Sequence, residues 1–149
     1  MIETLSMRVF MMHWFSQTLS INTSGKGLYD LTDQINSQIR EWAIKEGMAF
    51  LFNRHTSASL VINENYDPSA KRDLERFLDR LAPEGENWME HTMEGTDDSP
   101  AHMRTMITSS SMTIPVDNGK LSLGTWQGVF LAEHRNRSHA RQVLLRALG

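Results

Sequence analysis

Three histidines, His55, His91 and His102, stand in two blocks of the sequence that are rich in hydroxyl, amide and carboxylate side chains. The first block reads HTSASLVINEN from residue 55, and the second reads HTMEGTDDSPAH from residue 91. A polar group buried without a partner costs roughly 1–3 kcal/mol, so this density is unusual in a packed core. We therefore predict that the two blocks form a site, which holds a metal ion, a phosphate or only its own hydrogen bonds.

A metal ion held by the three histidines is one reading of these blocks. Neutral imidazole is the commonest protein ligand for zinc and similar ions, and three imidazoles leave a coordination position open. We expect Ser99-Pro100 to open a short helix that places His102 in its first turn, where the positive helix end disfavours imidazolium. The spacing of the histidines matches no local metal motif, so the fold must bring them together. Histidines that only make structural hydrogen bonds are the alternative.

The acidic residues in the two blocks are candidates for catalysis. Glu94, Asp97 and Asp98 lie between His91 and His102, where they could bind the ion, orient an imidazole or transfer a proton. Asp97 or Asp98 could equally cap the helix that Pro100 begins. Glu64, between two asparagines at the end of a predicted strand, is the fourth catalytic candidate, although turn chemistry also accounts for the asparagines.

Hydroxyl, amide and guanidinium groups near the histidines are candidates for binding a substrate, and above all a phosphate. These candidates are Thr56, Ser57, Ser59, Asn63, Arg104 and Arg135, with Trp126 and Gln127 at the rim. The basic cluster at 134–141 could meet phosphate or nucleic acid, but a turn of this size is more often solvated. No nucleotide-binding glycine loop and no Gly-x-Ser-x-Gly elbow occurs, which argues against those two classes of enzyme.

Composition excludes several classes of protein. The chain has 149 residues, enough for one domain, and a net charge of −3, which does not favour general binding of polyanions. Cysteine is absent, so any metal must be held by imidazole, carboxylate, carbonyl or water ligands. No apolar run approaches the roughly 18 residues of a membrane span, and we do not expect the first residues to act as a signal peptide. We expect a cytoplasmic protein.

The first half of the chain predicts a strand, a helix, a second strand and another helix. Residues 9–21 read as a strand, and a helix capped by Asp30 or Thr32 continues until Gly47. The apolar run 48–52 is typical of a strand buried on both faces. Asp67-Pro68 begins the next helix, and its inward stripe is expected to be Ala70, Leu74, Phe77, Leu78 and Leu81.

The second half predicts the short helix from Ser99 to about Ile107, followed by strands. Residues 111–116 and 120–123 flank Asp117-Asn118-Gly119, and Asn-Gly is the strongest short signal for a hairpin. Strands at 129–133 and 142–148 complete the set. We expect a single α+β domain in which two main helices and one short helix pack on a mixed or antiparallel sheet.

Five sequence blocks, in this order, resemble the YjbQ family of secondary thiamine-phosphate synthase-like proteins. They are His-Thr-Ser-Ala-Ser-Leu (55–60), Asn-Glu-Asn-x-Asp-Pro (63–68), Glu-Gly-x-Asp-Asp-x-Pro-Ala-His (94–102), Gly-Thr-Trp-Gln-Gly (124–128) and Glu-His-Arg (133–135). The resemblance runs from about Trp14 to the end of the chain, and residues 1–13 lie outside it. It implies a small α+β subunit assembled as a homotrimer, with a polar site that gathers His55, His91 and His102 and takes a divalent metal or phosphate. It also implies a weak joining of a pyrimidine diphosphate to a thiazole phosphate with release of pyrophosphate.

Residues and resemblance together predict a metal-dependent enzyme acting on a small phosphorylated or heterocyclic substrate. His55, His91 and His102 would hold the ion, which is zinc or another imidazole-preferring metal, or magnesium if the substrate is a diphosphate. The alternative is a trimeric module that binds a small phosphorylated metabolite without turnover. A factor that binds nucleic acid through the basic cluster is a third reading, and it predicts affinity that falls steeply with salt.

Overall fold

The computed structural model describes residues 11–149, and it contains three helices and eight strands in that range. The predicted α+β class is confirmed. The elements follow the chain in the order β1 (Trp14–Thr23), β2 (Gly27–Asp30), α1 (Thr32–Glu41), β3 (Gly47–Asn53), β4 (Ala58–Glu64), α2 (Pro68–Leu81), α3 (Asp98–Ile107), β5 (Ser111–Asp117), β6 (Lys120–Leu121), β7 (Gln127–Glu133) and β8 (His139–Leu148). Val9 and Phe10, where we predicted the first strand to start, lie outside the described residues.

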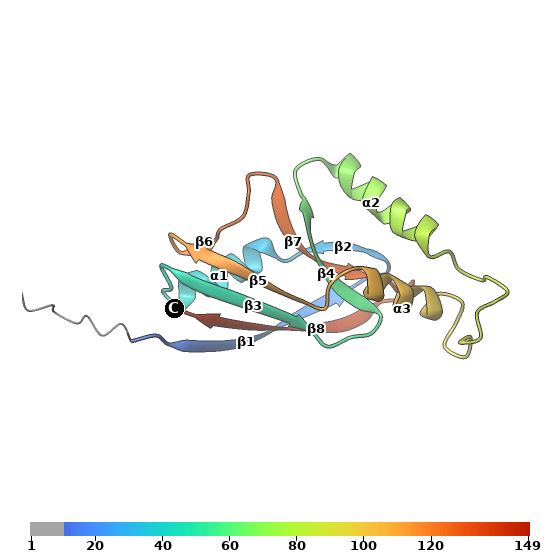
Figure 1. Ribbon diagram of the computed structural model, residues 1–149, viewed down its shortest axis with the longest axis horizontal. Coiled ribbons are helices and arrows are strands. Elements are labelled where there is room, and N and C mark those ends of the chain that lie inside the picture. The colour runs from blue at the N-terminus through green and yellow to red at the C-terminus, as the bar shows by residue number, and fades with distance from the viewer. Residues whose placement is uncertain (1–10) are drawn as a thin grey trace, which may run out of the picture.

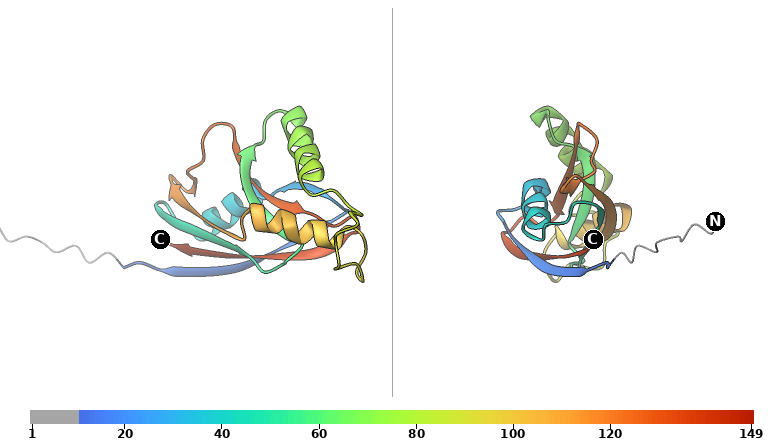
Figure 2. Two further views of the ribbon diagram at one scale, coloured as in Figure 1. Left: turned by 45° about the vertical axis from the view of Figure 1, so that its right-hand side comes forward. Right: turned by 90° about the vertical axis from the view of Figure 1, so that its left-hand side faces the viewer.

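The strands form two sheets, and every pairing is antiparallel. One sheet has the order β1-β8-β3-β5-β6 and the other has the order β2-β7-β4 (Figure 1). Helix α1 contributes Ile35 and Ile39, both 0% exposed, to the core that the two sheets share. The long loop 82–97 and helix α3 lie together at one end of the molecule, where β4 begins (Figures 1 and 2).

The apolar strand β3 is not buried on both faces, as we predicted. Ala49 and Leu51 are buried in the core, whereas Phe52 is 48% exposed. Side chains alternate between the faces of a strand, and within the described residues the face that carries Phe52 is left uncovered. The apolar run therefore identified the strand correctly but not its environment.

Helix α2 begins as predicted, with Asp67 accepting a hydrogen bond from the Ser69 N–H at 2.7 Å and Pro68 in the first helical position. Its predicted inward stripe is only partly confirmed: no residue of α2 is fully buried, Leu74 packs against the small core cluster of Leu28, Phe130 and Ala132, and Phe77 and Leu81 are exposed. The helix lies beside the three-stranded sheet (Figure 1), where Leu74 packs with side chains of β2, β7 and β4. The apolar side chains that it carries line an open groove of about 320 Å³ together with Val61 and Ile107.

Helix α3 begins at Asp98, one residue before the predicted start. His102 is therefore its fifth residue and lies in the second turn. The argument that the helix end keeps His102 neutral is weakened, since the field of a helix end falls off within one turn. The earlier start instead places Asp98 and His102 four residues apart on one helix, where side chains lie next to each other.

The other boundaries shift by a few residues. Helix α1 ends at Glu41 rather than near Gly47, which opens β3, and the short strand β2 was not predicted. The hairpin of β5 and β6 is confirmed, with Asn118 and Gly119 at φ of 53° and 78°. None of the helices described here is long and apolar enough to cross a bilayer.

Candidate metal centre

His91, Asp98 and His102 form a compact cluster at the start of α3. Their ligand atoms all lie within 4.8 Å of one another. The Nε2 atoms of both histidines converge on one oxygen of the carboxylate, Asp98 Oδ2, at 2.7 Å from His91 and 3.2 Å from His102. The Asp98 side chain is 1% exposed, while those of His91 and His102 are 52% and 38% exposed. The cluster is therefore fixed on its inner side and open to solvent on its outer side.

The backbone around Thr56 determines the proton position on His102. Its Nδ1 lies 2.8 Å from the Thr56 carbonyl oxygen, and a carbonyl can only accept, so Nδ1 carries the hydrogen. In the neutral ring, Nε2 then carries a lone pair and lies 3.2 Å from Asp98 Oδ2. A cation could bind to both atoms.

The donor atoms of the cluster suit a metal ion, but the closest of them lie nearer together than ligand atoms in an occupied site. Bonds near 2.1 Å in a tetrahedral site place ligand atoms roughly 3.4 Å apart, and the two closest pairs here are 2.7 and 3.2 Å apart. Modest side-chain rotation would open the space. Two imidazoles and one carboxylate form a donor set found in zinc enzymes, and a backbone carbonyl that orients one imidazole is a common outer partner.

Arg135 holds the other side of Asp98. Its Nη1 donates to Asp98 Oδ1, its Nε donates to Asp97 Oδ2 at 3.0 Å, and its Nη2 donates to the Glu94 carbonyl at 2.8 Å. Burial alone would raise the pKa of Asp97, but hydrogen bonds from the Asn136 backbone N–H and from Arg135 outweigh it and lower the pKa. Arg135, predicted to bind substrate, therefore makes its contacts with the loop that carries the cluster.

His55 lies outside the cluster. Its Nε2 accepts a hydrogen bond from the Gln142 N–H of β8 at 2.9 Å. Burial, reinforced by the charge of Arg141, lowers the pKa of His55. Of the three predicted ligands, the described subunit thus brings together His91 and His102, and Asp98 takes the third place.

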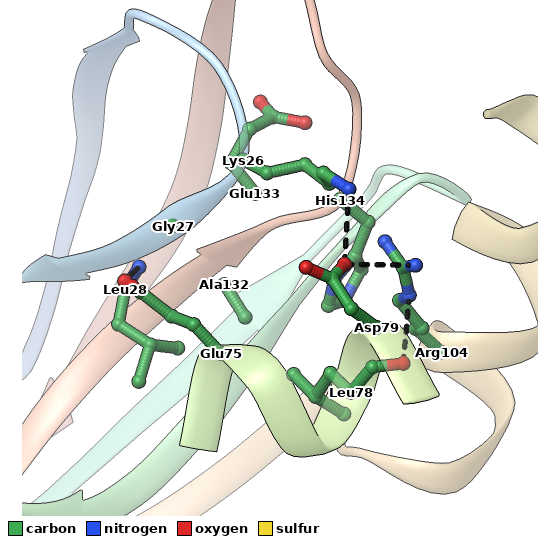
Figure 3. Close-up of a pocket in the computed structure, with 10 residues that line it drawn as sticks. All are labelled: Lys26, Gly27, Leu28, Glu75, Leu78, Asp79, Arg104, Ala132, Glu133 and His134. Atoms are coloured by element: carbon green, nitrogen blue, oxygen red, sulfur yellow. Dashed lines mark hydrogen bonds and ion pairs between the residues drawn. The ribbon is translucent and has the colours of Figure 1, made fainter. Parts of the chain in front are cut away.

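Arg104 is turned away from solvent, although we predicted it to bind a phosphate. It is 2% exposed, donates to the carbonyls of Leu78 and Ala82 at 3.3 and 2.8 Å, and pairs with Asp79 at 3.1 Å (Figure 3). These bonds tie the end of α2 to α3. A cavity of about 220 Å³ borders this arrangement and is also lined by His134.

The two serines of the first block are buried in hydrogen-bond networks. Ser57 Oγ accepts from Arg141 Nη2 at 3.0 Å, and Arg141 pairs with Glu133 at 2.6 Å. Ser59 Oγ lies 2.8 Å from His134 Nε2, which resembles a nucleophile and its base. Ser59 and His134 are only 1% and 2% exposed, however, so a substrate could not reach the hydroxyl. Ser57 thereby connects the loop before β4 to β8, and Ser59 connects β4 to the segment after β7.

The remaining candidates lie at the far end of β4. Glu64 pairs with Gln127 across β4 and β7, and Asn63 and Trp126 lie beside them. Trp126 is 54% exposed and packs edge-on against Tyr66 with ring centroids 4.8 Å apart. At about 3.3 Å per residue, the length of β4 separates this end from Thr56 and the cluster by roughly 20 Å. The predicted site residues thus do not form one site within the subunit.

Sequence reasoning missed the role of the Thr56 carbonyl and the pairing of Asp98 with His102. No sequence signal marks the carbonyl. The pairing could have been found from the Asp98-x-x-x-His102 spacing, had the helix been predicted to start one residue earlier.

Known proteins share this chain's sequence and fold. The family model for the UPF0047 protein YjbQ-like family matches residues 17–149. The UPF0047 protein sll1880 of Synechocystis is 46% identical over 133 residues, which cover 89% of this chain and 90% of the relative. The UPF0047 protein YjbQ of Escherichia coli O157:H7 is 37% identical, with 91% and 99% covered.

Solved structures agree with these relatives. A crystal structure of an uncharacterised YjbQ/UPF0047 protein from Clostridium acetobutylicum superposes with a TM-score of 0.79 at 34% identity, covering 88% of this chain and 98% of that one. A protein of unknown function from Sulfolobus solfataricus gives a TM-score of 0.79 at 26% identity, with 92% and 99% covered. The fold and the sequence together show that this chain belongs to the YjbQ-like UPF0047 family.

Proposed function

We propose that this protein is a metal-dependent enzyme that acts on a small molecule bound beside His91, Asp98 and His102. The observation that carries the proposal is the convergence of both Nε2 atoms on one oxygen of a buried carboxylate. The hydrogen on His102 Nδ1 leaves the lone pair on Nε2 available to bind a cation. Two nitrogen ligands favour zinc over magnesium.

The residues of the candidate site have distinct roles in this proposal. Asp98, His91 and His102 would bind the ion, and the Thr56 carbonyl would keep His102 in the required tautomer. Glu94, whose side chain is 67% exposed, lies at the rim and would transfer protons to and from the substrate. A bound divalent ion would supply Lewis-acid polarisation of a substrate oxygen.

The family resemblance supports the finer parts of the proposal. It implies a homotrimer, a phosphorylated or heterocyclic small molecule as substrate, and a weak thiamine-phosphate synthase-like transferase activity. In a homotrimer, His55 or the group at Glu64, Trp126 and Gln127 could complete the site of a neighbouring subunit. The cytoplasmic location stays a prediction from the sequence.

Metal binding by the purified protein tests the proposal. We expect about one zinc ion per subunit after dialysis against a metal buffer. The variants Asp98→Asn and His102→Ala should bind zinc at least tenfold more weakly, because each loses one of three ligands. His139→Ala, which removes an imidazole outside the cluster, is the matched control. The proposal fails if the wild-type protein binds no metal, or if all four proteins bind it equally.

His55→Ala separates the two possible ligand sets. Full zinc binding by this variant would establish the set with Asp98, whereas a large loss would show that His55 reaches the ion.

A binding module without turnover is the second candidate function. The openness of the cluster suits either role, but the exposed Glu94 carboxylate beside it favours chemistry. Incubation of the zinc-loaded protein with small metabolites distinguishes them, since the module would bind a ligand tightly and release it unchanged.

A further inference from the structure

A second cavity lies beside α2 and the edge strand β2. Its volume is about 220 Å³, and it shares none of the described residues with the metal cluster. Glu75 and Asp79 enter it from α2 (Figure 3). Arg104 lines it from α3, and Lys26 lines it from the position just before β2. The cavity thus brings together side chains of both charges from distant parts of the chain.

Two buried side chains of this cavity each keep a nitrogen atom without a partner. Arg104 and His134 are both 2% exposed. Arg104 bonds through Nε and Nη2, and His134 bonds through Nε2, which leaves Arg104 Nη1 and His134 Nδ1 unbonded within residues 11–149. The fully enclosed side-chain atoms that lack a partner in that range are Asn53 Oδ1 and Glu64 Oε2. The two nitrogens are therefore open to the cavity and not sealed in the core.

The carboxylates of the cavity also keep oxygens for a further partner. Asp79 Oδ1 accepts from Lys26 at 2.9 Å and from Arg104 at 3.1 Å. Glu75 Oε1 accepts from the Leu28 N–H at 3.1 Å. Asp79 Oδ2 and Glu75 Oε2 have no hydrogen-bond partner in the part of the chain that the structure describes. The two carboxylates are four residues apart on one helix, so they lie next to each other.

The ionised side chains of the wall balance in sign. Lys26 and Arg104 oppose Glu75 and Asp79, while Glu133, also at the wall, is compensated by a buried arginine at 2.6 Å. The described wall therefore carries no net charge and favours neither a cation nor an anion. It offers partners for both kinds of group within one small volume.

These groups match a molecule that carries both charges. An ammonium group donates up to three hydrogen bonds, which Glu75 Oε2 and Asp79 Oδ2 can accept. A carboxylate accepts strongly from a guanidinium group, and Arg104 Nη1 can donate to it. His134 is neutral at neutral pH, because burial and the charge of Arg104 lower its pKa to about 4. Its Nδ1 can bond to either group, according to the tautomer.

We propose that this cavity is a second binding site, which takes a small zwitterion with an ammonium and a carboxylate group close together, as in a free α-amino acid. The ammonium binds Glu75 and Asp79, and the carboxylate binds Arg104. Drug-sized ligands occupy pockets of roughly 300–1,000 Å³, so a cavity of about 220 Å³ suits a smaller molecule of this kind. The site is independent of the metal centre.

Calorimetric titration with free L-amino acids tests the proposal. A chelator is present, so that no amino acid is held by a metal ion. We expect at least one amino acid to bind. Its methyl ester lacks the carboxylate and its N-acetyl form lacks the ammonium, so each should bind about tenfold more weakly or worse. Absence of binding by every amino acid at millimolar concentration, or equal binding of either derivative, would overturn the proposal.

A pair of variants on α2 links that binding to the cavity. Glu75→Gln keeps the oxygen that accepts from Leu28 but removes the charge, and it should weaken the amino acid about tenfold or more. Asp73→Asn removes a charge from a side chain that is 77% exposed on the same helix, and it is the matched control. An affinity of Glu75→Gln equal to that of Asp73→Asn would show that the amino acid binds elsewhere. Zinc affinity should be the same in both variants and in the wild type, so this result and the test of the metal centre stay separate.

Discussion

Asp98 is the residue on which the candidate site depends, because its two carboxylate oxygens have different partners. Oδ2 faces both histidines, whereas Oδ1 accepts from Arg135. A carboxylate that is 1% exposed needs such a partner, since an uncompensated buried charge is costly. Arg135 therefore compensates the buried carboxylate and leaves Oδ2 facing the histidines.

Replacing Arg135 tests this positioning role. We expect Arg135→Met to lower zinc affinity by about 10- to 100-fold, as loss of an outer partner commonly does. Arg135→Lys keeps the charge but loses the fork that reaches Asp97 and Asp98 together, and it should recover only part of the affinity. Calorimetric zinc titration measures both.

The control is Arg137→Met, because Arg137 lies in the same turn with an exposed side chain. Zinc affinity in Arg135→Met equal to that in Arg137→Met would show that Asp98 needs no such support.

His134 makes stability depend on pH. Burial, with the nearby charge of Arg104, lowers the pKa of His134 from 6.5 to about 4. Between those values the unfolded chain binds a proton that the folded chain does not, so the free energy of unfolding falls as the pH drops from about 6.5 to 4. The full loss is about 3 kcal/mol. We expect His134→Gln to flatten this dependence in urea unfolding with a chelator present.

His55→Gln provides the comparison for that experiment. The pKa of His55 is also lowered, chiefly by partial burial, so its contribution has the same sign. A pH dependence of His134→Gln identical to that of the wild type would contradict the assignment to His134.

At the scale of elements, caps, turn residues and helical spacing predicted the helices and turns, because these depend mainly on residues close together in the sequence. The Asp67-Pro68 cap, the Asn118-Gly119 turn and the helical spacing of Ile35 and Ile39 each correspond to an observed element. Burial was less predictable, because it depends on neighbours far along the chain. Helix α2 has the periodicity of a packed helix and yet leaves Phe77 58% exposed.

The candidate site was predictable only in part for the same reason. His91, His102 and Asp98 lie within twelve residues, and one helix boundary brings them together. The bond from His55 to Gln142 joins β8 to the loop before β4, and no local pattern in the sequence marks it.

Two glycines offer a test of what holds the elements together. A Cβ on Gly47 would lie 2.0 Å from the Leu148 carbonyl oxygen, in the backbone of the strand paired with β3. Gly119 has φ of +78° but no contact closer than 3.7 Å. We expect Gly119→Ala to cost about 1 kcal/mol of unfolding free energy through backbone strain. Gly47→Ala should cost about 3 kcal/mol or more, because β3 and β8 must move apart.

Urea unfolding at neutral pH compares these variants. A smaller loss in Gly47→Ala than in Gly119→Ala would mean that the close approach of β3 to β8 is not needed for stability.

At the scale of the whole molecule, large apolar side chains are exposed on two faces. Phe77, Leu81 and Ile107 are 58%, 52% and 51% exposed around the groove beside α2, and Trp14 and Phe52 are 61% and 48% exposed on the five-stranded sheet. Large exposed apolar side chains that gather on one face are typical of interfaces. The homotrimer implied by the family resemblance would bury such surface.

Sedimentation or light scattering tests the trimer. We expect a mass of about 51 kDa, three times the chain's 17.1 kDa, at micromolar concentration. Phe77→Ser and Phe52→Ser each replace a half-exposed side chain, so neither should destabilise an isolated subunit much. The variant whose face lies in the interface should shift the mass toward the monomer, and the other serves as its control. A wild-type mass near 17.1 kDa would contradict the trimer, and any site completed by a neighbouring subunit would then be excluded.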